Sequence, residues 1–536
     1  MRIARAALAT AGSALLLAFA HPNPLRENGA GFVVFFALAP AFMALRGVRA
    51  RHGALLGALF GSAFHALSNY WLASWHPAAL AFVTVWEALF FAALFASVSA
   101  ARARFPRAWP LLVPLAWLAC ERLRSVGALA YPYGFPAYAL YGFKPALGLA
   151  ALGGIEAVSL AVGLANAALA AAAEAVPLAR LPGAGRESRP VSSHQARAGA
   201  SAAALIALGL LVAGGIFPAG GVEPGGSLKL ALVQPALAGR QSGAADYDRA
   251  VDRLLALSAK AAESRPDLIV WHETAVVPAI DWHLRYRREP AVYKVVRKAA
   301  DGVEALGIPV LLGTGRSESV GGDPSRRLSW NSARLSIPGL PPAHYDKTRL
   351  VPFAERFPAA SVFPRLAARV ERELGYFWQA GAGPDPLVLD GVPLATPICF
   401  EDSFPDLFAR FAERGARAFI LLTDDSWSRS ASMSRQHLAM SVFRAAETGL
   451  AVARATADGI SAVVGPDGAV LASLPRGVEG VLHAELPLAL PGSARSGAAA
   501  RGAWLGRAAL AACALALFSA LIVRLRTGRR RRGLRG

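Results

Sequence analysis

The sequence predicts a membrane protein in two parts, a multi-pass α-helical bundle of about eight spans and one water-soluble α/β domain. Apolar runs fill residues 1 to about 217 and return near 503–523. Residues 228–490 instead mix apolar, polar and charged side chains, as soluble domains do. Composition supports this division, because 54% of the 536 residues are hydrophobic and 17% are charged, against about 45–50% and about 25% in soluble proteins.

The bundle is predicted from the number of apolar runs long enough to cross about 30 Å of hydrocarbon. Candidate spans lie at 4–21, 30–46, 54–75, 78–100, 108–123, 150–176, 198–217 and 503–523. We therefore expect a membrane domain over 1–220 with about seven helices, a final span within 500–525 and a basic tail over 526–536. Met1–Ala20 also resembles a signal peptide, but a multi-span protein can use its first helix uncleaved, which is our expectation.

Arginines gather on one side of this predicted bundle and set its orientation. They lie at the N-terminus, after the second, fourth and sixth spans, and in the tail: Arg2, Arg5, Arg46, Arg49, Arg51, Arg102, Arg104, Arg107, Arg180, Arg186, Arg189, Arg197, Arg524, Arg526, Arg529, Arg530, Arg531, Arg532 and Arg535. The opposite loops carry only Arg26, Arg124 and Lys144. Basic loops favour the cytoplasm, so the soluble domain is expected outside it and the tail inside.

The net charge of +20 therefore has a membrane explanation. Nucleic-acid binding needs basic residues gathered on one folded face, whereas these arginines flank apolar runs, where anionic headgroups attract them. Nucleic acid is not an expected partner. Polar residues also stand in or beside the spans: Glu87, Glu121, Arg122, Glu156 and Asn166. A structural Glu121–Arg122 pair is the favoured interpretation, and a polar lining for lipid headgroups is the alternative.

The three cysteines are too few for a disulfide framework. Cys120 and Cys513 fall inside predicted spans, where free cysteine packs as a small apolar residue. Cys399 is the single thiol of the soluble domain, so it has no partner there for a disulfide. Cys399 is therefore either a residue without a chemical role or a reactive thiol.

From Ser227 onward the periodicity becomes that of a layered α/β domain, predicted to cover 227–490. Strand-like segments lie at 228–234, 268–271, 309–313, 331–335, 394–398 and 418–422, and helical segments at 247–263 and 434–447. Gly465–Gly468 predicts a hairpin turn. Sites of α/β domains form at strand ends, and the 268–271 and 394–398 segments lead into Glu273 and Cys399.

Glu273, Lys347 and Cys399 together suit two-step acyl transfer. A thiolate attacks acyl carbons, a carboxylate takes the thiol proton and returns it to a leaving group, and an ammonium stabilises the oxyanion. Residue types alone are weak grounds, since many Glu, Lys and Cys combinations exist in any chain.

The surrounding segments resemble the three signatures of the nitrilase superfamily: Trp271–Thr274, Tyr345–Glu355 and Pro397–Asp402. Further segments are similar to those of the apolipoprotein N-acyltransferases in particular: Leu350–Glu355, Gln436–Met440, Arg444–Gly449 and Arg454–Ser461. The predicted layout, seven spans before the domain and one after, is also similar, so the resemblance covers nearly the whole chain. It implies an αββα sandwich for the soluble domain.

The resemblance implies a ping-pong reaction between two lipid substrates. Cys399 would take the sn-1 acyl chain of a membrane phospholipid as a thioester. The chain would then pass to the α-amino group of the S-diacylglyceryl-cysteine of an apolipoprotein. Glu273 would act as general base and acid, and Lys347 as oxyanion stabiliser, with the N–H after Cys399 adding to the oxyanion hole. Glu355 and Glu401 would orient Lys347 and the site.

The family likeness also implies the setting. The chain is expected in the cell inner membrane with its catalytic domain periplasmic, without cofactor or metal, and a monomer suffices. Trp330, Asn331 and Trp427 are candidate substrate-binding residues, although the two tryptophans fit a core or rim position equally well. The region Phe353–Phe377 matches a mobile lipid-admitting arm of the family, with an ordinary surface loop as the alternative.

Some positions depart from the family pattern and concern the substrate pocket more than the triad. Phe400 replaces the usual Tyr beside the nucleophile, His272 replaces a Pro, a Trp expected soon after Gln234 is absent, and the segment 423–429 is altered. Asp424 and Asp425 lack companion ligands, so a structural role is favoured over a metal site. His272 and His437 are interpreted as hydrogen-bonded packing groups.

Two other functions remain open at this point. A membrane-tethered, nitrilase-like amidase would share the triad but need no lipid entrance. An inactive lipoprotein-binding homologue would explain Phe400 and the altered segment, although it would not explain why the triad and both glutamates persist.

Overall fold

The computed structural model describes residues 2–175, 193–237, 242–287, 289–374 and 378–532, with side chains omitted for 2, 193–197, 374 and 517–532. Arg180, Arg186, Arg189 and Arg535, which contributed to the predicted orientation, lie outside these residues. The chain divides into a helical unit and an α/β unit, the second covering Pro218–Ala499 and a short piece at Gly127–Leu129.

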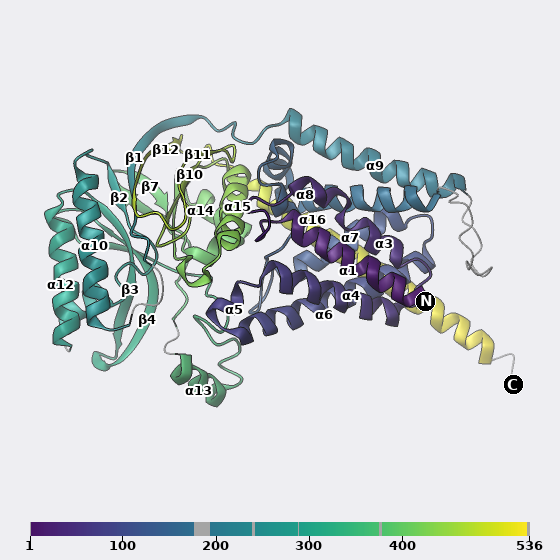
Figure 1. The fold of residues 1–536 in the computed structure, drawn as a ribbon, viewed down its shortest axis with the longest axis horizontal. Helices are drawn as coiled ribbons and strands as arrows, with labels where there is room; N and C mark the ends of the chain where they lie inside the picture. Colours follow the sequence, from purple (N-terminus) through teal and green to yellow (C-terminus); the bar gives the residue numbers. More distant parts are fainter. Residues whose placement is uncertain (1, 176–192, 238–241, 288, 375–377, 533–536) are drawn as a thin grey trace. The chain divides into compact units, whose positions relative to one another are not determined.

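The helical unit contains a helix, or a broken run of short helices, at each predicted span (Figure 1). Its elements are α1 (Arg2–Ala20), η1 (Gly31–Val33), α2 (Val34–Ala37), α3 (Ala39–Ala44), α4 (Ala50–Ser68), α5 (Leu72–Trp75), α6 (Pro77–Arg104), α7 (Trp109–Arg124), η2 (Pro136–Leu140), α8 (Lys144–Ala175), α9 (Ser193–Ile216) and α16 (Gly497–Arg532). Among the described residues, four helices are long and apolar enough to cross a membrane: α1, α6, α8 and α9. The membrane character is therefore supported, while the count of eight spans stays a prediction.

Two features explain why the spans differ from the sequence expectation. The second span is broken into short helices, and Asn166 of α8 holds the break. Its side chain accepts from the N–H groups of Leu38 and Ala39 at 2.8 and 3.1 Å, and donates to the carbonyl of Val34 at 2.8 Å. Helix α8 itself is kinked at Gly154, whose φ of +72° suits glycine alone.

The expected Glu121–Arg122 pair was wrong. Glu121 accepts a hydrogen bond from the Trp117 indole at 2.8 Å. The buried ion pair instead joins Arg124 to Glu87, and Arg124 also donates to the carbonyl of Tyr133 at 2.7 Å. Arg124 lies three positions after Glu121 on the helix, so both side chains face the bundle interior, whereas Arg122 points another way.

The α/β unit is built from two six-stranded sheets. The first has the order β12-β1-β2-β3-β4-β5 and the second β11-β10-β9-β8-β7-β6. The strands are β1 (Pro224–Gln234), β2 (Leu268–Val270), β3 (Val310–Val320), β4 (Asp323–Ser336), β5 (Ala343–Asp346), β6 (Leu387–Leu389), β7 (Val392–Ala395), β8 (Ala418–Thr423), β9 (Val452–Thr456), β10 (Ser461–Val464), β11 (Val470–Leu474) and β12 (Gly480–Ala489). The central pairs β1–β2, β2–β3, β7–β8 and β8–β9 are parallel.

The two sheets face each other, because β1 contacts β9, and β12 contacts β8, β10 and β11. Helices α10 (Ala244–Ala262), α11 (Ile280–Tyr286) and α12 (Pro290–Ala305) cover the first sheet (Figure 1). Helices α14 (Pro405–Glu413) and α15 (Ala431–Thr448) pack on the second. The predicted αββα layering is confirmed. Strand β2 is buried throughout, which explains its short run of apolar residues in the sequence.

Candidate active site

The three predicted reacting residues lie just beyond the ends of three strands. Glu273 follows β2 and Lys347 follows β5, both in the first sheet. Cys399 follows β7 of the second sheet and begins the short helix η3 (Cys399–Ser403). Each sheet thus supplies part of the triad, and the three groups interact electrostatically with one another.

The Lys347 ammonium is buried between two carboxylates. Its Nζ lies 3.1 Å from Glu273 Oε1 and 2.8 Å from Glu355 Oε1. The exposed fraction of the Lys347 side chain is only 1%. Burial lowers the pKa of Lys347, but the charges of Glu273 and Glu355 outweigh it, so the pKa lies well above its usual value. Lys347 is therefore a fixed cation at neutral pH.

Two further donors fix the Glu273 carboxylate. The Asn331 amide, on β4, donates to Glu273 Oε1 at 2.8 Å and to Glu355 Oε1 at 3.2 Å. The backbone N–H of Asp424, in the turn after β8, donates to Glu273 Oε2 at 3.2 Å. Asn331 was a candidate substrate-binding residue, and the structure places it on the two carboxylates.

Glu401 is fully buried and fixes the backbone beside Lys347, without contacting the ammonium. Its Oε1 accepts from the N–H and hydroxyl of Thr348, both at 2.7 Å, and from the N–H of Arg349 at 3.0 Å. Its Oε2 accepts from the N–H of Ile398 at 2.8 Å, and both oxygens accept from the Tyr345 hydroxyl. One carboxylate therefore joins the segment after β5 to the residue before Cys399.

Cys399 stands in a strained backbone conformation. Its φ is +50°, in the left-handed region that costs a non-glycine residue about 1–3 kcal/mol. The residue is only partly buried. Burial and the Glu273 carboxylate raise the pKa of the Cys399 thiol well above its usual value, against the opposing effects of Lys347 and of a hydrogen bond to Thr423. The resting nucleophile is a protonated thiol beside a carboxylate.

The remaining candidates lie around this centre in different ways. Phe400 is buried and packs edge-on against Phe404, with ring centroids 5.1 Å apart. Trp330 is partly buried and lies under the Arg316 guanidinium, 4.2 Å from the ring centroid. Trp427 is also partly buried. Neither tryptophan belongs to the fully buried core.

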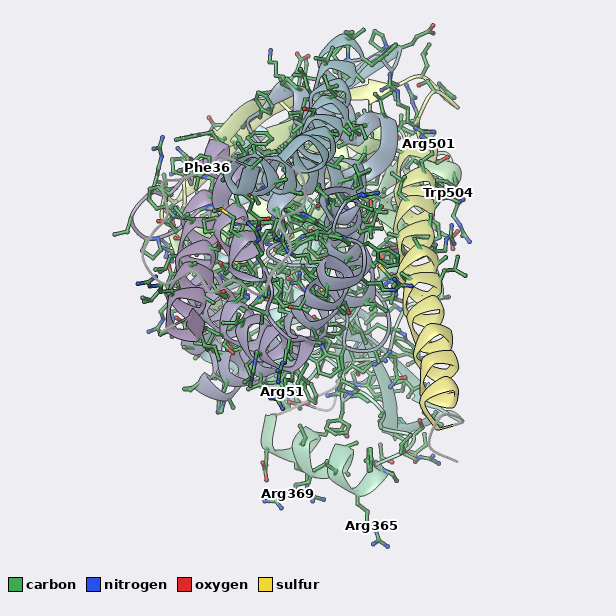
Figure 2. All side chains as sticks on the ribbon, turned by 90° about the vertical axis from the view of Figure 1, so that its right-hand side faces the viewer. Phe36, Arg51, Arg365, Arg369, Arg501 and Trp504 are labelled. Carbon is green, nitrogen blue, oxygen red and sulfur yellow. The ribbon has the colours of Figure 1, made fainter. Side chains whose placement is uncertain are left out.

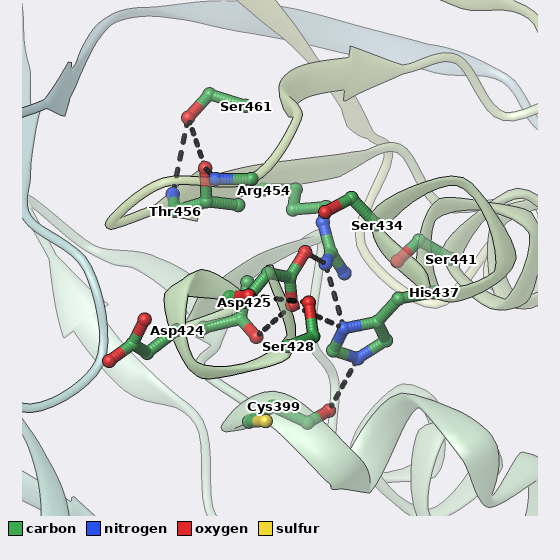
Figure 3. Close-up of polar contacts among 12 residues, drawn as sticks. Cys399, Asp424, Asp425, Ser428, Ser434, His437, Ser441, Arg454, Thr456 and Ser461 are labelled. Atoms are coloured by element: carbon green, nitrogen blue, oxygen red, sulfur yellow. Dashed lines mark hydrogen bonds and ion pairs between the residues drawn. The ribbon is translucent and has the colours of Figure 1, made fainter. Parts of the chain in front are cut away.

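The two histidines singled out in the sequence are buried. His272 Nδ1 lies 2.7 Å from the carbonyl oxygen of Glu273, and burial lowers the pKa of His272 to about 4, so it is neutral. His437, on α15, contacts a network of buried charges that the sequence did not reveal. Its Nδ1 lies 2.8 Å from Asp425 and 2.8 Å from Arg454 Nη2 (Figure 3). Its Nε2 lies 3.1 Å from Asp402, and Arg454 reaches both carboxylates.

The region 353–374 carries an exposed helix, α13 (Pro364–Leu374). Phe363 and Leu366 are 56% and 49% exposed, and Figure 2 shows Arg365 and Arg369 pointing away from the helix. Residues 375–377, the end of the predicted arm, lie outside the described residues. Within the described part of the chain, no group of three or more His, Cys, Asp or Glu side chains is arranged for a metal ion.

Comparisons with known proteins match both units. Residues 11–168 match the profile of the apolipoprotein N-acyltransferase N-terminal domain, and residues 229–496 match the carbon-nitrogen hydrolase profile. The chain is 35% identical over 493 residues to apolipoprotein N-acyltransferase 1 of Treponema pallidum, covering 88% of each chain. It is 29% identical to apolipoprotein N-acyltransferase 1 of Treponema denticola, covering 89% of this chain and 90% of that one.

Among solved structures, an amidase from Nesterenkonia sp. is similar with 21% identity and a TM-score of 0.32, over 51% of this chain and 94% of that chain. The match to the carbon-nitrogen hydrolase profile shows that the α/β unit is of the nitrilase type. The relatives do not favour the small-substrate amidase that the sequence left open.

Proposed function

Because the chain belongs to the apolipoprotein N-acyltransferase family and is an acyltransferase of lipoprotein maturation, we propose that it works through a thioester on Cys399. The acyl donor is the sn-1 chain of a membrane phospholipid. The acceptor is the α-amino group of the S-diacylglyceryl-cysteine of an apolipoprotein. The observation that carries this proposal is the buried Glu273–Lys347–Glu355 cluster beside a thiol at a strained strand end.

In the first half-reaction, Glu273 takes the proton of the Cys399 thiol as the sulfur attacks the ester carbonyl. The carbonyl oxygen becomes an oxyanion, which the Lys347 ammonium and the N–H after Cys399 stabilise. The C–O bond to the glycerol then breaks. Glu273 returns the proton to that oxygen, and a lysophospholipid leaves.

The second half-reaction repeats these roles with an amine as nucleophile. The α-amino group attacks the thioester carbon while Glu273 takes one of its protons. The C–S bond breaks, and the proton passes to the Cys399 sulfur, which restores the thiol and leaves an amide. Both steps balance without a cofactor.

The residues around the triad hold the three reacting side chains in place. Glu355 and Asn331 hold Lys347 and Glu273 at fixed separation, and Glu401 holds the backbone on both sides. Trp330 and Trp427 are kept as candidate lipid contacts. The basic loops support an inner-membrane protein with its α/β unit on the periplasmic side and its tail in the cytoplasm. All three reacting groups come from one chain, so a monomer is expected to be active.

The test is a defined reconstitution. Purified protein is incubated with phospholipid and a diacylglyceryl lipopeptide, and mass spectrometry follows the peptide. An added acyl chain with wild-type protein, and none with Cys399→Ala, supports the proposal. Ammonia release from small amides without lipid would show an amidase instead. Lipopeptide binding without turnover would show an inactive binding protein.

A further inference from the structure

Four charged side chains form a fully buried network behind the Cys399 loop. They are Asp402 of η3, Asp425 of the turn after β8, His437 of α15 and Arg454 of β9, and each is 0% exposed. Arg454 Nη2 lies 2.7 Å from Asp425, and Nη1 lies 3.5 Å from Asp402. His437 therefore lies between two carboxylates that share one guanidinium.

Charge balance favours a proton on His437, with Asp425 rather than the Arg454 guanidinium as the partner of its Nδ1–H; Arg454 Nη2 lies 2.8 Å from the same nitrogen. Two carboxylates and one guanidinium leave an excess negative charge, and an uncompensated buried charge is strongly destabilising. An imidazolium brings the sum to zero. Burial and Arg454 lower the pKa of His437, but Asp402 and Asp425 outweigh them and raise the pKa to about 9.

Besides the network itself, charged groups lie on several elements near His437. On η3, the Glu401 carboxylate accepts from the backbone N–H groups of Thr348 and Ile398. In the turn after β8, Asp424 accepts from the N–H of Ser426 at 2.9 Å.

The charged groups on α14 (Asp406, Arg410 and Glu413) are exposed, and β10 carries no titratable side chain. On α15 itself, Arg435 is half-buried, and Arg444 pairs with Glu447 at 2.9 Å. The protonation of His437 is thus governed by Asp402, Asp425 and Arg454.

The imidazolium joins the loop that carries Cys399 to the turn after β8, whose backbone holds Glu273. On one side, its Nε2 lies 3.4 Å from the carbonyl oxygen of Cys399 (Figure 3). The same nitrogen lies 3.1 Å from Asp402, and both residues belong to η3. On the other side, its Nδ1 contacts Asp425. Asp425 directly follows Asp424, whose N–H holds Glu273. The left-handed backbone of Cys399 persists only if its surroundings hold it.

We propose that His437 is a positioning residue for acyl transfer: as an imidazolium it ties the Cys399 loop to the turn that holds Glu273, and thiol and base lose their alignment when it is neutral. This role rests on the proposed function, in which Cys399 is the nucleophile. The direction of the pH dependence follows from the positive charge that the role of His437 requires. Thioester formation is fast while His437 is protonated and is lost as the pH rises through about 9.

Titration of three other groups of the site does not lower the rate of thioester formation near pH 9. The pKa values of Lys347, Cys399 and Tyr345 all lie well above their usual values. Lys347 and Tyr345 therefore keep their protons near pH 9. Ionisation of the Cys399 thiol would raise the rate of attack, so it cannot produce a falling limb. A decrease in rate near pH 9 reports on His437.

The experiment isolates the first half-reaction, which avoids titration of the acceptor amine. Full-length protein in detergent micelles is mixed with a dipalmitoyl phospholipid and no peptide, and mass spectrometry measures the rate of acyl-enzyme formation from about pH 6 to about pH 10. Wild-type protein should lose activity with an apparent pKa of about 9. Asp402→Asn keeps the shape of the side chain but removes one carboxylate, so the limb should move at least about one pH unit lower.

His437→Gln should form the thioester about 100-fold more slowly at pH 7, the effect of a misplacement of about 1 Å, and should show no alkaline limb. Flat or rising wild-type rates through pH 9 would overturn the proposal, as would an unmoved limb in Asp402→Asn. If His437→Gln does not fold, the pH profiles of wild-type protein and Asp402→Asn still test the proposal. Cys399→Ala distinguishes failure of the proposed function from failure of the His437 proposal. Acyl-enzyme in this variant would contradict the thioester mechanism. If Cys399→Ala forms no acyl-enzyme and the wild-type rate still does not fall near pH 9, only the role of His437 is contradicted.

Discussion

Replacement of Glu273 by glutamine removes the proposed base while keeping an acceptor for the Lys347 ammonium. The thiol pKa sets the size of the effect. An ordinary cysteine is ionised in only about 3% of molecules at pH 7, and burial and Glu273 raise the Cys399 pKa well above that level. Glu273→Gln must use this small thiolate fraction. Loss of a general base typically costs about 100- to 10,000-fold, so we expect thioester formation to slow by about 100-fold or more at pH 7.

The pH dependence distinguishes a lost base from a damaged site. Without Glu273, the rate should follow the thiolate fraction and rise about tenfold per pH unit above neutrality. Wild-type protein should show no such rise between about pH 7 and about pH 8. The assay is acyl-enzyme formation with phospholipid alone, followed by mass spectrometry. Glu355→Gln is the matched control, because it also removes a carboxylate from Lys347 but leaves the base.

The control should be slower than wild type and should keep the wild-type pH profile. A Glu273→Gln rate within about threefold of wild type at pH 7 would refute the role of Glu273. So would a rate in that variant that does not increase with pH. Equal slopes in both variants would show that the carboxylates act only by fixing Lys347.

Three further predictions concern stability, measured as thermal midpoints of detergent-solubilised protein. Glu401→Gln leaves either the Ile398 N–H or a donor on the other side without an acceptor, so the α/β unit should lose about 1–3 kcal/mol. Lys347→Ala should lose about 3–5 kcal/mol because two buried carboxylates lose their cation, and Lys347→Ala/Glu355→Ala should recover part of that stability but no activity. Burial raises the pKa of Asp424 to about 6, so the native state binds this proton more tightly than the unfolded chain. Asp424→Asn should therefore raise the free energy of unfolding at pH 7 by up to about 3 kcal/mol, seen as a higher thermal midpoint, and the gain should disappear below about pH 4.

Strand-end positions were the part of the site that the sequence predicted well. Glu273 and Cys399 follow short apolar segments, and the structure shows β2 and β7 there. Lys347 was identified from the surrounding family motif, since β5 has only four residues and little periodicity. The sequence pattern thus located the three side chains, while their catalytic roles remain a prediction.

Contacts between the two sheets were not predictable, because they join segments far apart in the chain and local sequence patterns do not indicate which segments meet. Glu401 was expected to orient Lys347, but its carboxylate is used by backbone N–H groups at Thr348, Arg349 and Ile398. The sequence predicts His437 to be a hydrogen-bonded packing group. Its charged state depends on Asp402 and Arg454, which lie on other elements and became visible only in the fold.

The helical unit shows the same limit in another form. A hydropathy count treats 30–46 as one span, yet the chain there forms short helices held by Asn166, more than a hundred residues away. In the sequence, Asn166 stands out only as a polar residue within an apolar span, where burial of its amide is costly. Its amide is instead fully used by backbone groups, which is the condition for irregular backbone in a protein interior.

The two sheets of the α/β unit are joined at the site by bonds that lie next to the reacting residues. The Asp424 N–H crosses from the second sheet to Glu273 of the first. The Glu401 carboxylate, two residues after Cys399, crosses to the backbone directly after Lys347. Because the nucleophile and the base belong to different sheets, their separation depends on these crossing bonds, and β2 or β7 alone cannot set it. A small slip between the sheets would therefore reduce acyl transfer before it measurably reduced folding stability.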